Sequence, residues 1–269
     1  MSHPDSNPSK EWRGIHISRG MRLRLSSLSI SIDREGNVHS PEPEVSVSID
    51  LFAYWLEIGM VHLIAAENAH QQLLAVWGRG DDQEGGQWLE KEFSASLQCI
   101  TASAIAIDAF YAMVRDHVQI PEKDIEVWRS NRTSRPKQIA EVLRRGFRIG
   151  PNRFSTMRKH LMELFKWRDW SVHPPDGFNK PVRYDELSIG TEWRFVAFRF
   201  ENAKNSLALS LSLIAQLLAR PKPDLDSLKE HCEAALPLIS PLVEQWESKY
   251  GQLYEREASG NETSPSSEG

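Results

Sequence analysis

The spacing of the apolar residues changes at Asp50, and no other feature limits the fold of this chain as strongly. Before Asp50, apolar and polar residues alternate, which is the pattern of a β-strand with two different faces. From Asp50 to Tyr250, apolar residues recur every three or four positions, which is the pattern of amphipathic helices. The sequence therefore predicts a mainly α protein, in which a helical bundle follows a small N-terminal β-structure.

The N-terminal part predicts a β-hairpin arm over residues 21–50. Alternation runs through residues 21–33 and returns at 45–49, and residues 34–37 (Arg-Glu-Gly-Asn) supply a turn between them. Because a lone hairpin is only marginally stable in water, we expect the arm to pack on the main body or to pair with a second subunit. Residues 1–20 are polar and contain two prolines, so we expect them to be disordered.

Residues 51–250 predict one domain, a bundle of five or six helices, followed by a disordered tail over residues 251–269. Pro237 and Pro241 are expected to kink or divide the last helix. The helical periods cover residues 50–76, 87–118, 137–147, 152–172, 202–218 and 225–250, with one or two further turns at 121–128.

The segments between these helices predict other structure. Glycines in residues 78–86 are expected to separate the first two helices, and short extended pieces are expected at 182–184 and 193–200. His173 precedes Pro174, and the residue before a proline disfavours the helical region. We therefore expect His173 to stand at the end of its helix, ahead of a long loop.

Composition points to an ordinary globular protein. The chain has 269 residues, a formal net charge of −5 and a hydrophobic fraction of 40%. No stretch approaches the roughly 20 apolar residues that a membrane span needs, and the first residues lack the apolar core of a signal peptide. Cys99 and Cys232 lie in helical apolar patterns, which favours reduced core thiols. These features predict a cytoplasmic protein that is not bound to a membrane.

A basic block departs from this acidic average. Residues 129–168 contain twelve basic and only two acidic side chains, so the block carries ten positive charges in excess. Such a block attracts a polyanion such as RNA by counterion release, although a solvated helix face gives the same pattern. The candidate phosphate-binding residues are Arg144, Arg145, Arg148, Arg158, Lys159 and Lys166.

The basic block ends in the sequence Arg168-Asp169-Trp-Ser-Val-His173, which combines side chains that can act on a phosphodiester. The planar guanidinium of arginine binds phosphate through two parallel hydrogen bonds. The imidazole of histidine titrates near neutral pH and can transfer protons. The motif places an arginine, an acid and a histidine within one and a half helical turns. These are the types of side chain that metal-free cleavage of RNA requires.

This motif resembles the Arg-polar-x(3–5)-His signature of the HEPN superfamily, whose domains are small helical bundles. The similarity covers roughly residues 50–218: residues 104–114 resemble the small-residue helix with an embedded acid, here Asp108, and residues 200–218 resemble the helix that closes the bundle. The resemblance implies a metal-independent endoribonuclease of a prokaryotic defence or toxin–antitoxin system. It also implies a homodimer with both motifs in a shared cleft, and an antitoxin or sensor partner.

The chemistry that we expect of these residues needs no metal or cofactor. Neutral His173 would take the proton of a ribose 2′-OH, or protonated His173 would protonate the leaving 5′-oxygen. Arg168 would bind the scissile phosphate and stabilise the charge that builds on its oxygens, and Asp169 would orient Arg168 or His173. The products would carry a 2′,3′-cyclic phosphate and a 5′-OH. Two copies of His173 in a symmetric dimer could supply acid and base.

Each candidate residue also has a structural interpretation. Arg168 and His173 can stabilise the helix C-terminus, where a cation meets the helix dipole favourably. Asp169 can form a surface ion pair, and Asp108 can be the partner of a cation inside the bundle. Trp170 can stack on a base or anchor the core. The alternative function is therefore a non-catalytic, dimeric HEPN-like module that binds RNA or a protein.

Other catalytic classes lack their motifs in this sequence. The chain contains no HExxH, no GxSxG and no GxxxxGK[ST], and its cysteines are not paired at metal-binding spacing. His160 and His173 are thirteen positions apart and are expected on different faces of their helix. The sequence thus predicts no metal site and no cofactor.

Overall fold

The computed structural model describes residues 15–25, 30–39, 45–173 and 180–254. The disorder predicted for the two ends falls largely on residues 1–14 and 255–269, outside these ranges. The start of the long loop after His173 lies outside them as well. The chain divides into two compact units, Met1–Asp50 and Leu51–Gly269.

The first unit contains two pairs of antiparallel strands. β1 (Met21–Leu25) pairs with β4 (Val45–Ile49), and β2 (Ser31–Ile32) pairs with β3 (Val38–His39). The turn between β2 and β3 is closed by Asp33, whose Oδ1 accepts hydrogen bonds from the backbone N–H groups of Glu35 and Asn37, both at 2.9 Å. Gly36 adopts a φ of +87°, which a side chain would disfavour. The predicted turn at residues 34–37 is therefore present.

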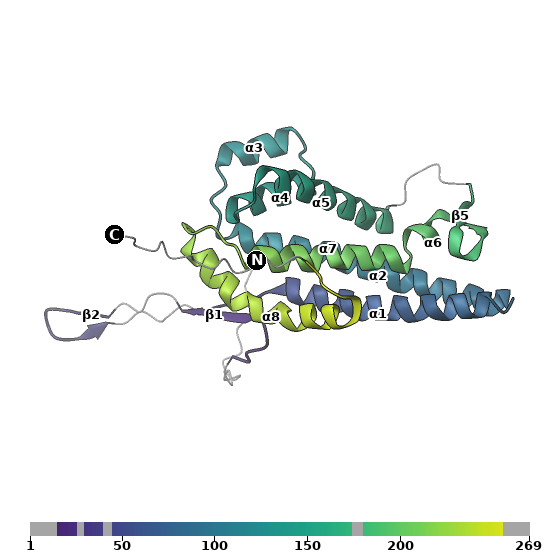
Figure 1. Cartoon of the computed structure of the whole chain (residues 1–269). Helices are drawn as coiled ribbons and strands as arrows, with labels where there is room; N and C mark the ends of the chain where they lie inside the picture. The colour runs from purple at the N-terminus through teal and green to yellow at the C-terminus, as the bar shows by residue number, and fades with distance from the viewer. Residues whose placement is uncertain (1–14, 26–29, 40–44, 174–179, 255–269) are drawn as a thin grey trace, which may run out of the picture. The chain divides into compact units, whose positions relative to one another are not determined.

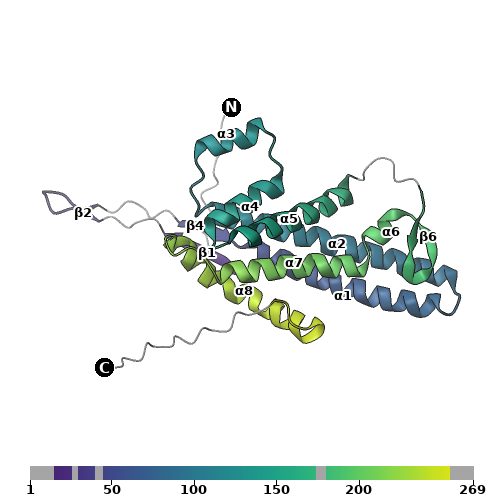
Figure 2. The same ribbon diagram turned by 45° about the horizontal axis from the view of Figure 1, so that its top comes forward.

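Three long helices form the centre of the second unit: α1 (Leu51–Trp77), α2 (Asp82–Arg115) and α7 (Phe200–Leu218). They lie side by side in both views (Figures 1 and 2). Small residues let them approach closely, because a methyl group on Gly59 of α1 would lie only 2.9 Å from Leu207 Cδ1 of α7. The Ser210 hydroxyl of α7 also donates a hydrogen bond to the backbone carbonyl of Ser103 in α2, at 3.0 Å.

The turn between α1 and α2 is shorter than the glycines of residues 78–86 predict. Asp81 caps α2, since its Oδ1 accepts a 2.9 Å hydrogen bond from the Glu84 N–H. Gly85 lies within α2, where the helix packs closely against the Trp77 ring. An added Cβ would lie only 2.7 Å from that ring, so a glycine fits this position. Gly85 and Gly86 therefore belong to the helix, and their predicted role in breaking it is wrong.

Two further helices, α4 (Arg135–Gly146) and α5 (Pro151–Val172), pack against α2 (Figure 1). Both have a proline in the first or second helical position, where its missing N–H costs nothing, and they begin two residues and one residue before the predicted starts at 137 and 152. α5 buries Met157, Leu161, Leu164 and Phe165. α3 (Glu122–Ser130), which precedes α4, has no buried residue.

A short β-pair and a short helix join α5 to α7. β5 (Val182–Tyr184) pairs with β6 (Ile189–Thr191) around a 3₁₀ turn, Asp185–Leu187. α6 (Trp193–Ala197) follows, beside the β-pair in Figure 2. The extended piece predicted at 182–184 is confirmed. The one predicted at 193–200 is wrong, because Glu192 caps a helix there and accepts a 2.9 Å hydrogen bond from the Arg194 N–H.

The last helix, α8 (Asp226–Tyr250), contacts α1 and α7. One helix runs through Pro237 and Pro241, so the prolines do not divide it. Cys232 of α8 and Cys99 of α2 are buried free thiols, and burial raises the pKa of each to about 12. The structure is mainly α, with eight α-helices among the described residues instead of five or six. The additional ones are the short α3 and α6.

By length and composition, α2 alone among the described helices could cross a membrane. Within its most apolar window, 61% of the residues are buried inside the protein. The core helix of a soluble protein can have the same length and composition, so this property alone does not show that α2 spans a membrane.

Candidate functional site

The three residues of the predicted catalytic motif lie at the C-terminal end of α5. Arg168 and Asp169 occupy its last turn and a half, and His173 is the C-cap residue, as the proline that follows it predicts. The His173 backbone N–H donates a 2.7 Å hydrogen bond to the Asp169 carbonyl, which fixes the chain at the helix end. The His173 side chain is exposed.

Arg168 is positioned by its neighbours on α5. Its Nε atom lies 3.1 Å from Oδ1 of Asp169, but the angle between them is not that of a hydrogen bond. The guanidinium also lies over the Phe165 ring, 5.1 Å from the ring centre. Asp169 is 63% exposed and Arg168 33%. Within the described residues, the His173 side chain makes no hydrogen bond or ion pair with either of them, and the motif lines neither of the two grooves described below.

Contacts with α2 and α6 hold the end of α5 in place. The Ser171 hydroxyl donates a 2.6 Å hydrogen bond to the Arg168 carbonyl and accepts one of 3.3 Å from Thr101 of α2. Trp170 packs edge to face on Trp167 at 5.7 Å and on Trp193 of α6 at 5.5 Å. The ring of Trp170 thus anchors the helix end that carries the motif.

Asp108 does not join the motif. Its Oδ1 pairs at 2.7 Å with the guanidinium of Arg135, which also lies over the Tyr111 ring at 4.1 Å. Asp108 therefore connects α2 to the start of α4. Among the described residues it makes no hydrogen bond or ion pair with Arg168, Asp169 or His173 that would support the predicted role at the motif.

The predicted phosphate-binding residues fall into two groups. Acidic neighbours neutralise the first group: Glu141 pairs with Arg144 at 2.7 Å and Arg145 at 2.8 Å, and the latter also pairs with Asp124 at 2.6 Å. The hydrogen bond with Arg144, more than the one with Arg145, lowers the pKa of the Glu141 carboxyl. Glu163 pairs with Lys166 at 3.2 Å. The second group, which has no such pair among the described residues, is Arg148, Arg158 and Lys159.

Arg148 lines a groove of about 470 Å³ between the first half of α5 and the second half of α7. A smaller groove of about 270 Å³ continues along the same two helices to Trp167. The two grooves share His160 and Leu209. The groove could not be predicted from the basic block, because part of its lining comes from α7, which lies outside that block.

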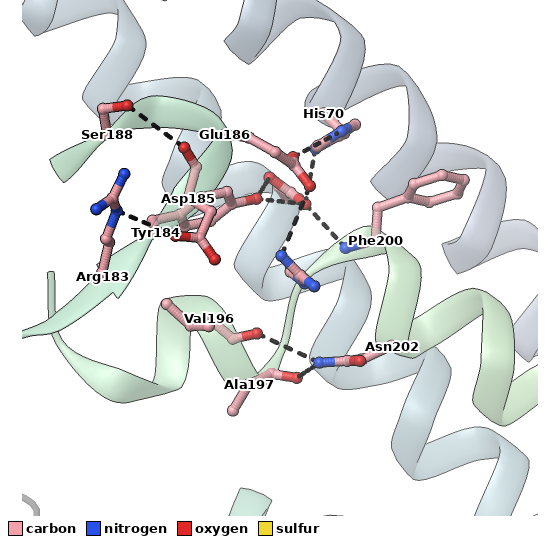
Figure 3. Close-up of polar contacts among 12 residues, drawn as sticks. His70, Arg183, Tyr184, Asp185, Glu186, Ser188, Val196, Ala197, Phe200 and Asn202 are labelled. Atoms are coloured by element: carbon pink, nitrogen blue, oxygen red, sulfur yellow. Dashed lines mark hydrogen bonds and ion pairs between the residues drawn. The ribbon is translucent and has the colours of Figure 1, made fainter. Parts of the chain in front are cut away.

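A buried polar cluster, which the sequence did not predict, lies at the other end of α7 (Figure 3). Glu92 of α2 is 1% exposed, and its carboxylate accepts hydrogen bonds from the Phe200 N–H at 2.8 Å and the Tyr184 hydroxyl at 3.2 Å. It also pairs with Nδ1 of His70 at 3.1 Å, and Nε2 of that ring lies 3.3 Å from Glu186.

This cluster shifts the pKa values of its members. The hydrogen bond with Glu92 raises the pKa of His70 above 6.5, against the opposing effect of burial. Burial is the largest cause that raises the pKa of Tyr184, and the negative charge of Glu92 adds to it. The members lie far apart in the sequence and form no motif, so no sequence signal could have identified them. The cluster connects α1, α2 and the β5–β6 segment to α7.

Comparison with protein-family models, with curated proteins and with solved structures finds no match for this chain. Within the described ranges, no three His, Cys, Asp or Glu side chains come together as a metal-ligand set. Two histidines do meet, since Nε2 of His117 lies 2.7 Å from Nδ1 of His231. The candidate site therefore rests on the residues of α5 themselves.

Proposed function

We propose that this chain is a metal-independent endoribonuclease of the HEPN type, acting in the cytoplasm, with Arg168, Asp169 and His173 as its catalytic residues. One observation carries the proposal. An exposed histidine ends α5 five residues after an arginine that Asp169 and Phe165 hold at the protein surface. α2, α5 and α7 would be the helices of a HEPN-like arrangement.

The proposed reaction is an internal transesterification. His173 takes the proton of the ribose 2′-OH, and the 2′-oxygen attacks the phosphorus. The bond from phosphorus to the 5′-oxygen breaks, and this oxygen leaves as a 5′-OH after it receives a proton. Arg168 stabilises the negative charge that builds on the phosphate oxygens. The other product end is a 2′,3′-cyclic phosphate.

A dimer would supply what one copy lacks. Within a single chain, Arg168 and His173 line neither of the two grooves described above, and His173 alone cannot be base and acid in the same step. A two-fold dimer that places the ends of both α5 helices together would form a shared cleft with two copies of each residue. An antitoxin or sensor that binds the same face would restrain the activity.

Mixed variants test the roles and the dimer together. Arg168→Ala and His173→Ala are each expected to lower the cleavage rate by about 100-fold or more. Wild type refolded with an excess of His173→Ala should lose more activity than dilution explains, because a mixed dimer holds only one intact His173 and cannot supply both base and acid. His62→Ala on α1 is the matched control and should cut as the wild type does. Loss of activity in the control, or full activity in either variant, contradicts the assignment.

A second candidate function is a non-catalytic RNA-binding or protein-interaction module. The observation that favours it is that Arg148, Arg158 and Lys159 are exposed on or beside α5, away from the catalytic motif. If wild type and His173→Ala bind RNA equally and neither cuts it, this second function replaces the first.

A further inference from the structure

Three hydrogen-bonding side chains form a continuous chain between the end of α2 and the start of α8. Nδ1 of His117, in the turn that follows α2, lies 3.0 Å from the hydroxyl oxygen of Ser227. The other ring nitrogen of His117, Nε2, lies 2.7 Å from Nδ1 of His231. Both distances are within hydrogen-bonding range, so one imidazole contacts a hydroxyl on one side and a second imidazole on the other.

The fold places these side chains in order from the surface to the interior. Ser227 is exposed, His117 is half-buried and His231 is only 4% exposed. Ser227 and His231 are four positions apart on α8 and therefore lie on the same face of that helix. The His117 backbone N–H donates a 3.0 Å hydrogen bond to the Val114 carbonyl, which fixes the turn at the end of α2.

This order of side chains is the one that activates a serine. The hydroxyl becomes a nucleophile when a base takes its proton, and a third group must orient that base. When Nδ1 of His117 accepts the Ser227 proton, Nε2 carries a hydrogen and donates it to Nδ1 of His231. The buried His231 thus fixes the tautomer of His117 and accepts a stronger hydrogen bond once His117 is protonated.

The start of α8 supplies donors for the negative charge that an attack by this serine creates. Within the described residues, the backbone N–H groups of Asp226, Ser227 and Leu228 make no hydrogen bond, and no side chain caps this helix of 25 residues. N–H groups at a helix start, together with the positive end of the helix dipole, stabilise an oxyanion formed beside them. Nucleophile, base, orienting group and oxyanion donors therefore meet at one place.

We propose that Ser227 is the nucleophile of a second active site, with His117 as its base and His231 as its positioning residue, which hydrolyses carboxylic esters. Ser227 lines neither of the two grooves between α5 and α7. Because its hydroxyl is exposed, we expect weak binding and a preference for small acyl groups. The site uses no residue of α5, so it does not depend on the proposed ribonuclease function.

The reaction has two balanced steps. Oγ of Ser227 attacks the carbonyl carbon of the ester while His117 takes the hydroxyl proton, and the bond from this carbon to the alkoxy oxygen breaks. The alcohol leaves with the proton that His117 returns. A water molecule then gives a proton to His117 and attacks the acyl carbon. The bond to Oγ breaks, Ser227 regains its proton, and the carboxylic acid leaves.

The test is labelling of the full chain with a fluorophosphonate, which phosphonylates an activated serine and releases fluoride. Mass spectrometry of the digested protein should find one label per chain, on Ser227. Ser227→Ala should carry no label, and His117→Ala should lower the labelling rate by about 100-fold or more, because general-base assistance is lost. Ser248→Ala, which changes an exposed serine of the same helix, is the matched control and should be labelled as fast as the wild type.

Hydrolysis of p-nitrophenyl acetate gives a second readout. Ser227→Ala should lose turnover at an unchanged unfolding temperature, since Ser227 is exposed and its removal opens no cavity. His231→Leu should lower turnover by about tenfold or more. His231→Asn should recover most of it, because an amide oxygen can accept the hydrogen bond from His117 in place of Nδ1. An effect of burial alone would not distinguish these two variants.

The proposal is overturned if the wild type carries no label on Ser227, if labelling survives His117→Ala, or if His231→Leu and His231→Asn reduce turnover equally. RNA cleavage is measured with separate variants on α5. A negative result here therefore leaves the ribonuclease proposal as it stands, and the reverse also holds.

Discussion

Glu92 is a carboxylate in a place where burial of a charge is costly unless it is paired. Its partners satisfy it: the Phe200 N–H, the Tyr184 hydroxyl and the His70 ring all reach the same two oxygens. Glu92 of α2 thereby connects its own helix to α1, to the β5–β6 segment and to α7. Removal of the Glu92 carboxylate would leave the Phe200 N–H and the Tyr184 hydroxyl without this acceptor in the interior, and the His70 ring would keep only its contact with Glu186.

Substitution of Glu92 is expected to destabilise the protein strongly. Glu92→Ala should lower the free energy of unfolding by about 3–5 kcal/mol, the usual cost of breaking a buried ionic contact. Urea unfolding followed by circular dichroism measures this change. Glu90→Ala, an exposed glutamate on the same helix, is the control and should change stability by less than about 0.5 kcal/mol. Equal stability of the two variants would show that the cluster contributes little.

His70 makes this stabilisation depend on pH. Its pKa is raised in the folded protein, first by the hydrogen bond with Glu92 and further by the charges of Glu92, Glu186 and Glu201. A raised pKa means that the folded state binds the proton more tightly than the unfolded state. The stabilisation is therefore fully present below pH 6.5, the ordinary pKa, and is lost as pH rises through the folded value.

The comparison of wild type with His70→Gln tests this dependence. The difference in their unfolding free energies should be larger at about pH 6 than at about pH 8.5. In a Glu92→Ala background, most of this pH dependence should disappear, because the largest cause of the shift is absent. A difference that stays constant or grows with pH would contradict the assigned role of His70.

At the scale of elements, the close approach of α1 and α7 depends on Gly59. A larger side chain there meets Leu207, which is fully buried, and an added Cβ would lie only 2.9 Å from its Cδ1 atom. Gly59→Val should lower the free energy of unfolding by about 1–3 kcal/mol, the usual cost of overpacking. Gly86 in α2 has nothing within 4 Å of an added Cβ, so Gly86→Ala should raise stability by about 0.5–1 kcal/mol. Thermal or urea unfolding measures both, and a neutral Gly59→Val would show that the helices can separate.

The elements also show what a sequence can and cannot predict. The helix end at His173 follows a local rule and was predicted. The helix starts were predicted at residues 137 and 152, whereas α4 begins at Arg135 and α5 at Pro151, because proline fits the first turn of a helix. The start of α2 was not predicted, because Gly85 is placed by contact with Trp77 and not by its own preference. α6 was missed for a similar reason, since the Glu192 cap and the packing of Trp193 on Trp170 outweigh the local pattern.

At the scale of the whole molecule, the candidate site was only partly predictable. The motif at the end of α5 comes from one continuous segment, so its position on the helix could be derived from spacing alone. The groove and the Glu92 cluster each combine residues from segments that meet only through the fold. The excess positive charge of the basic block could be counted in the sequence. Which of its side chains are neutralised could not, because Asp124 and Glu141 pair with Arg145 only in the folded protein.

The most direct test of the proposed function is the chemistry of the ends left on an RNA that is incubated with the protein in EDTA. We expect the wild type to cut, and mass spectrometry to find a 2′,3′-cyclic phosphate and a 5′-OH at each new pair of ends. His173→Ala should leave the RNA intact under the same conditions. Ends that carry a 3′-OH and a 5′-phosphate, or cleavage that survives His173→Ala, would contradict the assignment of catalysis to the end of α5.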